Sequence, residues 1–236
     1  MRQEQFAYSS VRGLLHQQKN IVNQDSYVVK RYKFGTVLVV SDGMGSHKHS
    51  DVGSQAACKA VCDAIQKWVQ YNEKDIRLLI PIIHGYWNME IFPYSKKECG
   101  ATCLVAFVSN EGKLYVAQLG DGNIYISLNN QLELLQVKED DFSNFTSGMS
   151  SIASFDEWTI KEYDISDKEV KLVLMTDGVS ETLIENKKEA FVKLLWQKMG
   201  MLESSSTRNN MVYSLLNGWN SVNAGDDRTL VCYIKK

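Results

Sequence analysis

The sequence lacks any long apolar run, and its 236 residues include only two prolines. A helix that crosses a bilayer needs about 20 predominantly apolar residues, and no stretch approaches that length. The start, MRQEQFAYSS, lacks the apolar centre of a signal peptide. We therefore expect a cytoplasmic (cytosolic) protein with no membrane partner.

Basic residues are not in excess either. Lys and Arg number 26 against 28 Asp and Glu, so the formal net charge is -2 at pH 7. This balance provides no positive field over the whole surface, and we expect no nucleic-acid partner. The chain is long enough for one large core and shows no linker, so we expect a single domain over residues 1–236 and a monomer.

The five cysteines lack the C-x-x-C spacing of zinc and redox sites. Cys58 and Cys62 lie one helical turn apart, and Cys99 and Cys103 have the same spacing. A metal pair is one interpretation of this spacing. Buried, reduced thiols are the favoured interpretation, because small apolar thiols are common in the cores of proteins from reducing compartments.

Nine segments show the apolar pattern and the β-branched or aromatic content of strands. They are SYVVKRY, TVLVVS, ATCLVAFVS, KLYVAQL, NIYISL, LELLQV, WTIKEY, VKLVLMT and TLVCYI. Amphipathic helices are expected over residues 51–71, 75–91, 187–199 and 204–219, where Pro81 either kinks the second helix or delays its start. Short turns join several consecutive strands, which favours antiparallel sheets covered by helices, an α+β fold.

Acidic residues stand beside the ends of several predicted strands. They are Asp42, Asp121, Asp177 and the pair Asp226 and Asp227. A single Asp-Gly after a strand is usually a simple turn in which the aspartate caps its own backbone. Four acidic turns in one chain indicate more, because carboxylates gathered at one edge repel one another.

A divalent cation can keep such carboxylates ionised. Mg²⁺ and Mn²⁺ prefer oxygen ligands from Asp side chains, backbone carbonyls and water. Gly43, directly after Asp42, lets a carbonyl approach an ion without a side chain in the way. The sequence therefore predicts a site for Mn²⁺ or Mg²⁺.

Six motifs together extend this prediction to a family. They are NQDSY at 23–27, VSDGMGS at 40–46, GAT at 100–102, LGDGN at 119–123, MTDG at 175–178 and GDDRT at 225–229. Their order and spacing resemble those of the type 2C metal-dependent serine/threonine protein phosphatases, bacterial single-domain members included. The resemblance implies a four-layer α-β-β-α sandwich, in which helix pairs flank two mostly antiparallel sheets and two metal ions lie between the sheets.

The same resemblance assigns the ligands. Asp42 would bridge both ions and the Gly43 carbonyl would bind one of them, while Asp177 and Asp226 would complete the other ion's protein ligands. These three aspartates are the expected catalytic residues. Asp121 would serve a third, looser metal position.

Further residues are expected to support these ligands. By the resemblance, Gln24 would contact metal-bound water, and Asp25 would lie behind the ligands. Asp227 occupies a position that is often Asn in the family, and we place it beside the ligands as well.

The resemblance also implies the reaction. Two ions about 3.5–4 Å apart acidify a bridging water, which then attacks phosphoserine or phosphothreonine in line, so that no protein nucleophile is needed. The implied partners are a phosphorylated protein substrate and an opposing serine/threonine kinase, and the implied role is dephosphorylation in signalling.

One departure from the family concerns phosphate binding. Asn20 stands where the family usually has its phosphate-gripping arginine. Arg12, His16 and Lys19 lie nearby, and one of them could hold the phosphate instead. Residues 138–156, where the family has a mobile flap, are expected to form either a substrate-selecting loop or an ordinary solvated connection.

The remaining histidines are weighed in the same way. His47 and His49 are interpreted as solvent-facing residues at a helix start, with proton donation as the alternative. His84 is expected to be structural. Two other functions stay open: a catalytically weak phosphoprotein-binding module (a pseudophosphatase), and a phosphohydrolase of small phosphorylated molecules.

Overall fold

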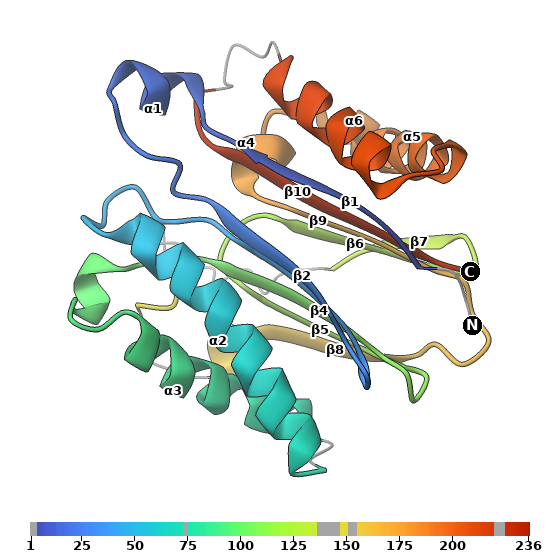
Figure 1. Ribbon diagram of the computed structural model, residues 1–236, viewed down its shortest axis with the longest axis horizontal. Coiled ribbons are helices and arrows are strands. Elements are labelled where there is room, and N and C mark those ends of the chain that lie inside the picture. Colours follow the sequence, from blue (N-terminus) through green and yellow to red (C-terminus); the bar gives the residue numbers. More distant parts are fainter. Residues whose placement is uncertain (1–3, 73–74, 136–146, 151–154, 220–224) are drawn as a thin grey trace. The chain divides into compact units, whose positions relative to one another are not determined.

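The computed structural model describes residues 4–72, 75–135, 147–150, 155–219 and 225–236 (Figure 1). They form two five-stranded sheets with helices, and the chain divides into two compact units. The first unit comprises Met1–Asn23, Gly122–Leu135 and Asp167–Lys236, and the second comprises Gln24–Asp121 and Gln136–Ser166. Each unit has one antiparallel sheet and its own helices, which confirms the predicted α+β class.

The sheet of the first unit brings the two ends of the chain together. Its strands, in spatial order, are β1 (Glu4–Val11), β10 (Arg228–Lys235), β9 (Val170–Met175), β6 (Asn123–Leu128) and β7 (Gln131–Leu134). Every neighbouring pair is antiparallel. Because β10 lies between β1 and β9, it brings the segment after β1 and the segment after β9 to the same end of the sheet.

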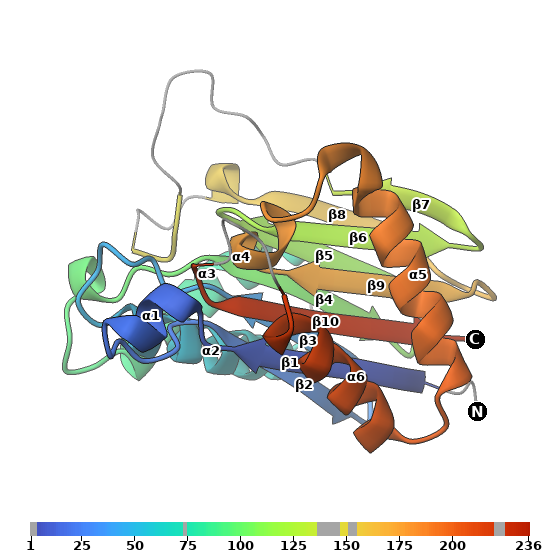
Figure 2. The ribbon, with the colours of Figure 1, turned by 90° about the horizontal axis from the view of Figure 1, so that it is seen from above.

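Helices α5 (Lys188–Met201) and α6 (Ser205–Asn217) cover this sheet (Figure 2). Val192 and Leu195 of α5 and Leu216 of α6 are buried together with Val173 and Cys232 of the strands. Strand residues two apart and helix residues three or four apart share a face, so these two periodicities produce one core. The short helices α1 (Leu14–Gln18), α4 (Asp177–Ser180) and η4 (Glu185–Lys187) belong to the same unit.

The sheet of the second unit consists of β2 (Ser26–Tyr32), β3 (Gly35–Ser41), β4 (Cys103–Ser109), β5 (Lys113–Leu119) and β8 (Thr159–Asp164), in that spatial order. All four pairings are antiparallel. Every residue of β3 and of β4 is buried, as their continuous apolar sequences predict. Asp42, the residue after β3, is therefore the first polar group after a wholly buried strand.

Helices α2 (Ser50–Gln70) and α3 (Leu79–Glu90) pack together over this second sheet (Figure 1). Val39 and Phe107 of the sheet share a core with Ile65 of α2 and Trp87 of α3. Pro81 lies in the first turn of α3, where no backbone N–H is needed, so the prediction of a delayed helix start is confirmed. The unit also contains the short helices η1 (Ile76–Leu78), η2 (Lys96–Glu98) and η3 (Phe155–Glu157).

Two differences from the predicted elements concern the first unit. All nine predicted strands correspond to strands, but β1 was not predicted, because EQFAYSSV has few apolar residues and pairs with β10 alone at a sheet edge. Of the predicted strand LELLQV, only residues up to Leu134 belong to β7. None of the helices in the described part of the chain combines the length and the apolar character that a bilayer crossing requires.

Candidate functional site

In the first unit, the predicted ligands meet where β9 ends and β10 begins. Thr176 donates its backbone N–H to the Thr229 carbonyl (3.1 Å), and Thr229 N–H donates to the Thr176 hydroxyl (3.0 Å). This pairing holds Asp177, the next residue after Thr176, at the same end of the sheet as Asp226 and Asp227. Two of the three predicted catalytic aspartates are thus placed by one antiparallel strand pair.

The glycine after Asp177 is required by packing. A Cβ atom at Gly178 would overlap the backbone carbonyl oxygen of Asp227. Gly178 N–H donates to Asp177 Oδ1 at 2.6 Å. The Asp-Gly pair therefore lets the turn after β9 lie directly against the segment that leads into β10, and this contact explains the Asp-Gly motif at that strand end.

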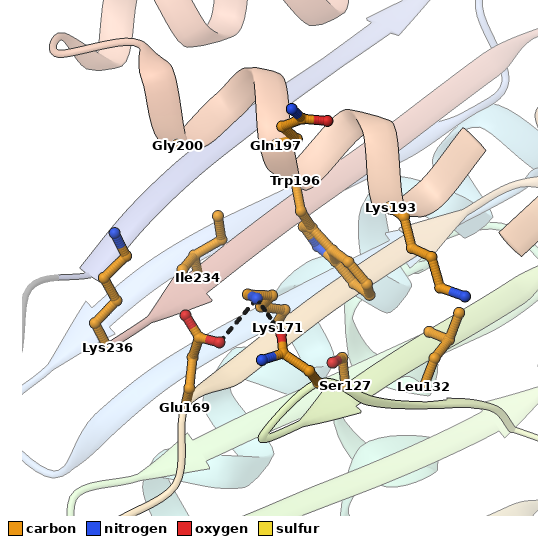
Figure 3. A pocket seen from close by; sticks show the side chains of 11 residues that line it. Ser127, Leu132, Glu169, Lys171, Lys193, Trp196, Gln197, Gly200, Ile234 and Lys236 are labelled. Atoms are coloured by element: carbon orange, nitrogen blue, oxygen red, sulfur yellow. Dashed lines mark hydrogen bonds and ion pairs between the residues drawn. The ribbon is translucent and has the colours of Figure 1, made fainter. Parts of the chain in front are cut away.

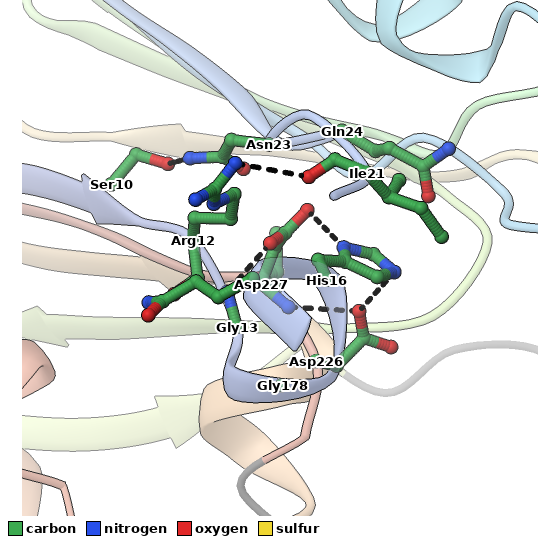
Figure 4. A network of polar contacts seen from close by, with 12 residues as sticks. Ser10, Arg12, Gly13, His16, Ile21, Asn23, Gln24, Gly178, Asp226 and Asp227 are labelled. Atoms are coloured by element: carbon green, nitrogen blue, oxygen red, sulfur yellow. Dashed lines mark hydrogen bonds and ion pairs between the residues drawn. The ribbon is translucent and has the colours of Figure 1, made fainter. Parts of the chain in front are cut away.

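A histidine joins the two acidic residues before β10 (Figure 4). His16 Nδ1 lies 2.9 Å from Asp227 Oδ2, and His16 Nε2 lies 4.0 Å from Asp226 Oδ1. Asp227 N–H donates to Asp226 Oδ1 at 2.8 Å. The side chain of Asp227 is 1% exposed, that of His16 is 16% exposed and that of Asp226 is 55% exposed. His16, Asp226 and Asp227 each offer one ligand atom, and these atoms lie within 4.8 Å of one another, close enough for the three side chains to hold a cation.

Two glycines allow α1 to approach this acidic segment. A Cβ at Gly13 would overlap the backbone of Asp226, and a Cβ at Gly225 would overlap the Leu15 side chain. Leu15 N–H donates to the Gly225 carbonyl at 3.0 Å. Gly13 N–H donates to Asp227 Oδ1 at 2.7 Å. Neither Gly13 nor Gly225 was predicted to matter, because no local pattern shows which backbone segments lie in contact.

The three candidates for phosphate binding differ in position. Arg12 Nη1 donates to the Ile21 carbonyl at 3.3 Å (Figure 4), and Lys19 is exposed after α1. Only His16 lies directly beside the predicted ligand Asp226. Residues 12–19 thus contain two cationic side chains and one imidazole, and the buried carboxylate of Asp227 holds the imidazole in place.

In the second unit, backbone hydrogen bonds hold the Asp42 turn. Asp42 N–H donates to the Thr102 hydroxyl at 2.9 Å, and the Asp42 carbonyl accepts from Thr102 N–H at 2.8 Å. Gly43 N–H donates to the Gln24 carbonyl at 3.1 Å. A Cβ at Gly43 would lie 2.6 Å from the Ser50 carbonyl oxygen, so only glycine fits there. Thr102 belongs to the GAT motif, a signal that could have identified it.

The residues expected behind the ligands belong to the same unit. Gln24 contacts the turn through its backbone carbonyl, which also accepts a hydrogen bond from the Ser54 hydroxyl at 2.5 Å. Asp25 is buried. Asp121 is exposed on the turn after β5, between Gly120 (φ 82°) and Gly122 (φ 102°), both in the left-handed region that favours glycine. The convergence of Asp42, Gly43 and Asp121 with the first unit's aspartates stays a prediction.

The other histidines lie on loops and helices of the second unit. The His47 Nδ1 atom lies 2.7 Å from the Lys97 carbonyl oxygen, and the His49 ring stacks on Tyr94 with centroids 4.0 Å apart. His84 is buried and accepts a hydrogen bond from Trp158 Nε1 at 3.2 Å. Burial lowers the pKa of His84 to about 4. His84 is therefore a neutral structural residue, as predicted.

The five cysteines were interpreted either as buried thiols or as a metal pair. All five are free and buried. Burial raises the pKa of Cys58, Cys103 and Cys232, which disfavours the thiolate that a metal would need. The burial expected in the favoured interpretation is confirmed, and the reduced state stays a prediction.

A cavity of about 440 Å³ lies under α5 in the first unit, at the opposite strand ends from Asp177 (Figure 3). Within it, Lys171 Nζ contacts Glu169 at 2.8 Å and Asn130 at 2.8 Å, and Trp196 Nε1 donates to the Leu172 carbonyl. The residues that line the cavity include none of the predicted ligands. The predicted flap, residues 138–156, lies largely outside the described residues.

Comparison with known proteins identifies the family. The family model of protein phosphatase 2C matches residues 12–216. The chain therefore belongs to the protein phosphatase 2C family, and the family predicted from its motifs is confirmed. Serine/threonine phosphatase stp of Listeria monocytogenes serotype 4b (strain F2365) is 28% identical over 115 residues, which are 42% of this chain and 41% of that protein. The chain thus aligns with about two-fifths of the length of this curated relative.

Solved structures support the fold over nearly the whole chain. PppA, a key regulatory component of T6SS in Pseudomonas aeruginosa, has a TM-score of 0.68 at 16% identity and covers 99% of this chain and 98% of its own. The catalytic domain of the serine threonine protein phosphatase PstP, in complex with two manganese ions, has a TM-score of 0.63 at 17% identity and covers 100% and 99%. At these identities the likeness concerns the fold.

Proposed function

We propose that this chain is a metal-dependent protein serine/threonine phosphatase, active as a single domain over residues 1–236. The supporting observation is the acidic residue at each expected strand end, in a chain of this family. Asp42 follows β3, Asp177 follows β9 and Asp226 precedes β10. Each stands beside a glycine, and packing against backbone atoms requires the glycine at Gly43 and Gly178.

These residues fit hard divalent cations. Asp42 and the Gly43 carbonyl would act from the second unit, Asp177 and Asp226 from the first, and Asp121 would serve a third position. Carboxylate and carbonyl oxygens are the donors that Mg²⁺ and Mn²⁺ prefer. When bound, such ions supply an acidified water and positive charge for the phosphoryl oxygens.

The chain's own residues have supporting roles in this proposal. Thr102 and Gln24 hold the Asp42 turn through backbone hydrogen bonds. Arg12 and Lys19, on the segment beside Asp226, are the cations available for a phosphoryl group, since Lys19 is exposed and the Arg12 guanidinium makes a long hydrogen bond of 3.3 Å to the Ile21 carbonyl. We assign them to substrate binding rather than to chemistry, because guanidinium and ammonium groups bind phosphate without transferring protons at neutral pH.

The substrate class follows from the family. The curated relative is named a serine/threonine phosphatase, and we propose phosphoserine and phosphothreonine in proteins as substrates. A cytoplasmic location, a monomeric state and an opposing serine/threonine kinase belong to the same proposal. Phosphate removal by this chain would then reverse the action of that kinase.

The test compares phosphate release from a phosphothreonine peptide, a phosphotyrosine peptide and nucleotides, with Mn²⁺ present. We expect release from the phosphothreonine peptide by the wild type and its loss in Asp42→Asn. Asp164→Asn, which changes an exposed aspartate at the end of β8, is the matched control and should retain release.

Three outcomes would contradict the proposal. Release that survives in Asp42→Asn would refute the assigned chemistry. No release from any substrate by the metal-loaded wild type would indicate a phosphoprotein-binding module. Preference for nucleotides would indicate a small-molecule phosphohydrolase.

A further inference from the structure

His16 is held in one ring orientation and in one tautomer. Asp227 Oδ2 lies 2.9 Å from His16 Nδ1, and an ionised carboxylate can only accept a hydrogen bond. Nδ1 therefore carries the hydrogen when the ring is neutral, and Nε2 carries the lone pair. The lone pair of Nε2 is what a metal ion binds.

Nε2 faces the exposed carboxylate of Asp226. The distance from Nε2 to Asp226 Oδ1 is 4.0 Å, too long for a direct hydrogen bond. Two ligand atoms with bonds of about 2.0–2.2 Å lie about 3.4 Å apart on a tetrahedral ion and about 4.2 Å apart when they are on opposite sides of an ion. The present distance lies between these values, and the pair can share one ion once Asp226, which is 55% exposed, rotates to bring its oxygen closer.

The backbone around His16 supports this orientation. Ile21 N–H donates to the His16 carbonyl at 2.8 Å, and Gly13 N–H binds the other oxygen of Asp227 at 2.7 Å. The buried carboxylate of Asp227 thus fixes the His16 imidazole through Nδ1, the ring nitrogen that does not face Asp226. A carboxylate in this position is the general partner of metal-binding histidines, because it sets the tautomer and makes the free nitrogen a better ligand.

We propose that His16 Nε2 is a nitrogen ligand of the ion that Asp226 holds, with Asp227 as the positioning residue. A nitrogen ligand makes this position favour Zn²⁺ most strongly and Mn²⁺ over Mg²⁺, because imidazole suits zinc, and Mn²⁺, although it prefers oxygen, accepts a nitrogen ligand more readily than Mg²⁺ does. The inference rests on the proposed function only in taking Asp226 as a metal ligand.

The direct test is pulsed electron paramagnetic resonance of the full chain loaded with Mn²⁺. Coordination by His16 predicts modulation from a ¹⁴N nucleus bound to Mn²⁺, replaced by a ¹⁵N pattern when histidine is labelled. His16→Gln should abolish the nitrogen signal. His49→Gln, which changes a histidine of the second unit that stacks on Tyr94, is the matched control and should keep it.

A second variant tests the tautomer and leaves the ring in place. In Asp227→Asn, the side-chain oxygen can still accept from Gly13, but the amide would donate to Nδ1 and so move the ring hydrogen to Nε2. We expect Mn²⁺ and Zn²⁺ binding, measured by calorimetry, to weaken about 10- to 100-fold. Mg²⁺ binding should change by less than about threefold, because oxygen ligands remain.

Two results would overturn the inference. The first is Mn²⁺ bound to the wild type with no nitrogen modulation. The second is an equal loss of Mg²⁺ and Mn²⁺ affinity in His16→Gln, since a residue that only shapes the loop would affect both ions alike. Either result leaves the proposed function standing if phosphate release still depends on Asp42, so the two failures are distinguishable.

Discussion

The two acidic loops, Asp42–Gly43 in the second unit and Asp226–Asp227 in the first, are held by different kinds of contact. Asp42 is fixed through its own backbone: its N–H and C=O both bond to Thr102. Asp226 and Asp227 are fixed largely through side chains, with His16 bound to Asp227 and the carboxylates accepting from backbone N–H groups.

The two loops therefore differ in how much they depend on neighbouring side chains. The Asp42 turn is positioned by backbone groups of Asp42 and Gly43, so its place in the fold does not depend on the Asp42 carboxylate. The chemistry of a loop held by side chains changes when one of those side chains is replaced. Here the contact between His16 and Asp227 determines which ring nitrogen of His16 faces Asp226. The first unit is therefore where this chain is expected to depart from its relatives in ion preference.

The histidines show the same contrast. His16 is partly exposed between two carboxylates, whereas His84 is 3% exposed and bonds to the indole of Trp158. Burial, together with the positive charge of Lys96, favours the neutral ring, so the pKa of His84 falls to about 4. One imidazole is thus placed for a ligand and the other for packing.

The largest expected effect would show that the ligands are not equivalent. Asp226→Asn should lower Mn²⁺-dependent phosphate release by more than about 100-fold, because a ligand contributes at least as much as the residues behind it. Asp121→Asn should lower it by less than about tenfold, since Asp121 is exposed on a turn and is proposed for a looser third position. Initial rates on a phosphothreonine peptide measure both. Equal losses in the two variants would contradict the assignment.

The second-largest effect is expected from disrupting the contact between the turn after β9 and the segment that leads into β10. Gly178→Val should destabilise the protein by about 3 kcal/mol, because its side chain would overlap the Asp227 carbonyl in a packed region. Urea unfolding measures the free energy. Asp177 should lose its place beside Asp226, so Mn²⁺ affinity should also fall. A fully stable variant would show that the close approach is not required.

Stability should also depend on pH through the buried histidine. His84 is neutral in the folded protein down to pH about 4, whereas its ordinary pKa is 6.5. As pH falls from 6.5 to 4, the unfolded chain takes up a proton that the native state excludes, so stability falls by up to about 3 kcal/mol and then levels off.

The control for this effect is His84→Gln, whose side-chain oxygen can still accept from Trp158. The difference in unfolding free energy between wild type and His84→Gln, measured in urea at pH 7 and pH 4.5, should shrink toward the acidic side. Parallel pH profiles would count against a buried neutral histidine.

A smaller effect sharpens the comparison on the second unit. Thr102→Val keeps the shape of the side chain but leaves the Asp42 N–H without its acceptor. An unsatisfied buried donor costs about 1–3 kcal/mol, and we expect a loss near 2 kcal/mol in urea unfolding. Thr102→Ser, which keeps the hydroxyl, is the matched control and should lose less stability. No difference between the two variants would show that this bond does not hold the turn.

The smallest effect has the opposite sign. A Cβ at Gly200, in α5, would meet no atom within 4 Å. Gly200→Ala should therefore stabilise the protein by about 0.5–1 kcal/mol, because alanine is the better helix former. Thermal unfolding measures the shift, and a loss of stability would show that this glycine has a contact of its own.

The sequence predicted most elements because their patterns are local. VLVVS before Asp42 and VKLVLM before Asp177 are continuous apolar strands, and the helices follow the 3.6-residue period. β1 escaped prediction, since EQFAYSSV is a half-buried edge strand with few apolar residues. The candidate acidic ligands could be predicted for the same reason, because each lies close to the end of a predicted strand.

The sequence by itself determined which residues are available. They are carboxylates beside strand ends, glycines next to them, and His16, which lies shortly before Asn20, the position where the family's arginine is expected. Tertiary structure alone decided that His16 meets Asp227, 211 residues further along the chain. The physical reason is strand order. β10 pairs with both β1 and β9, and this pairing brings together segments that are far apart in the chain and share no local sequence pattern.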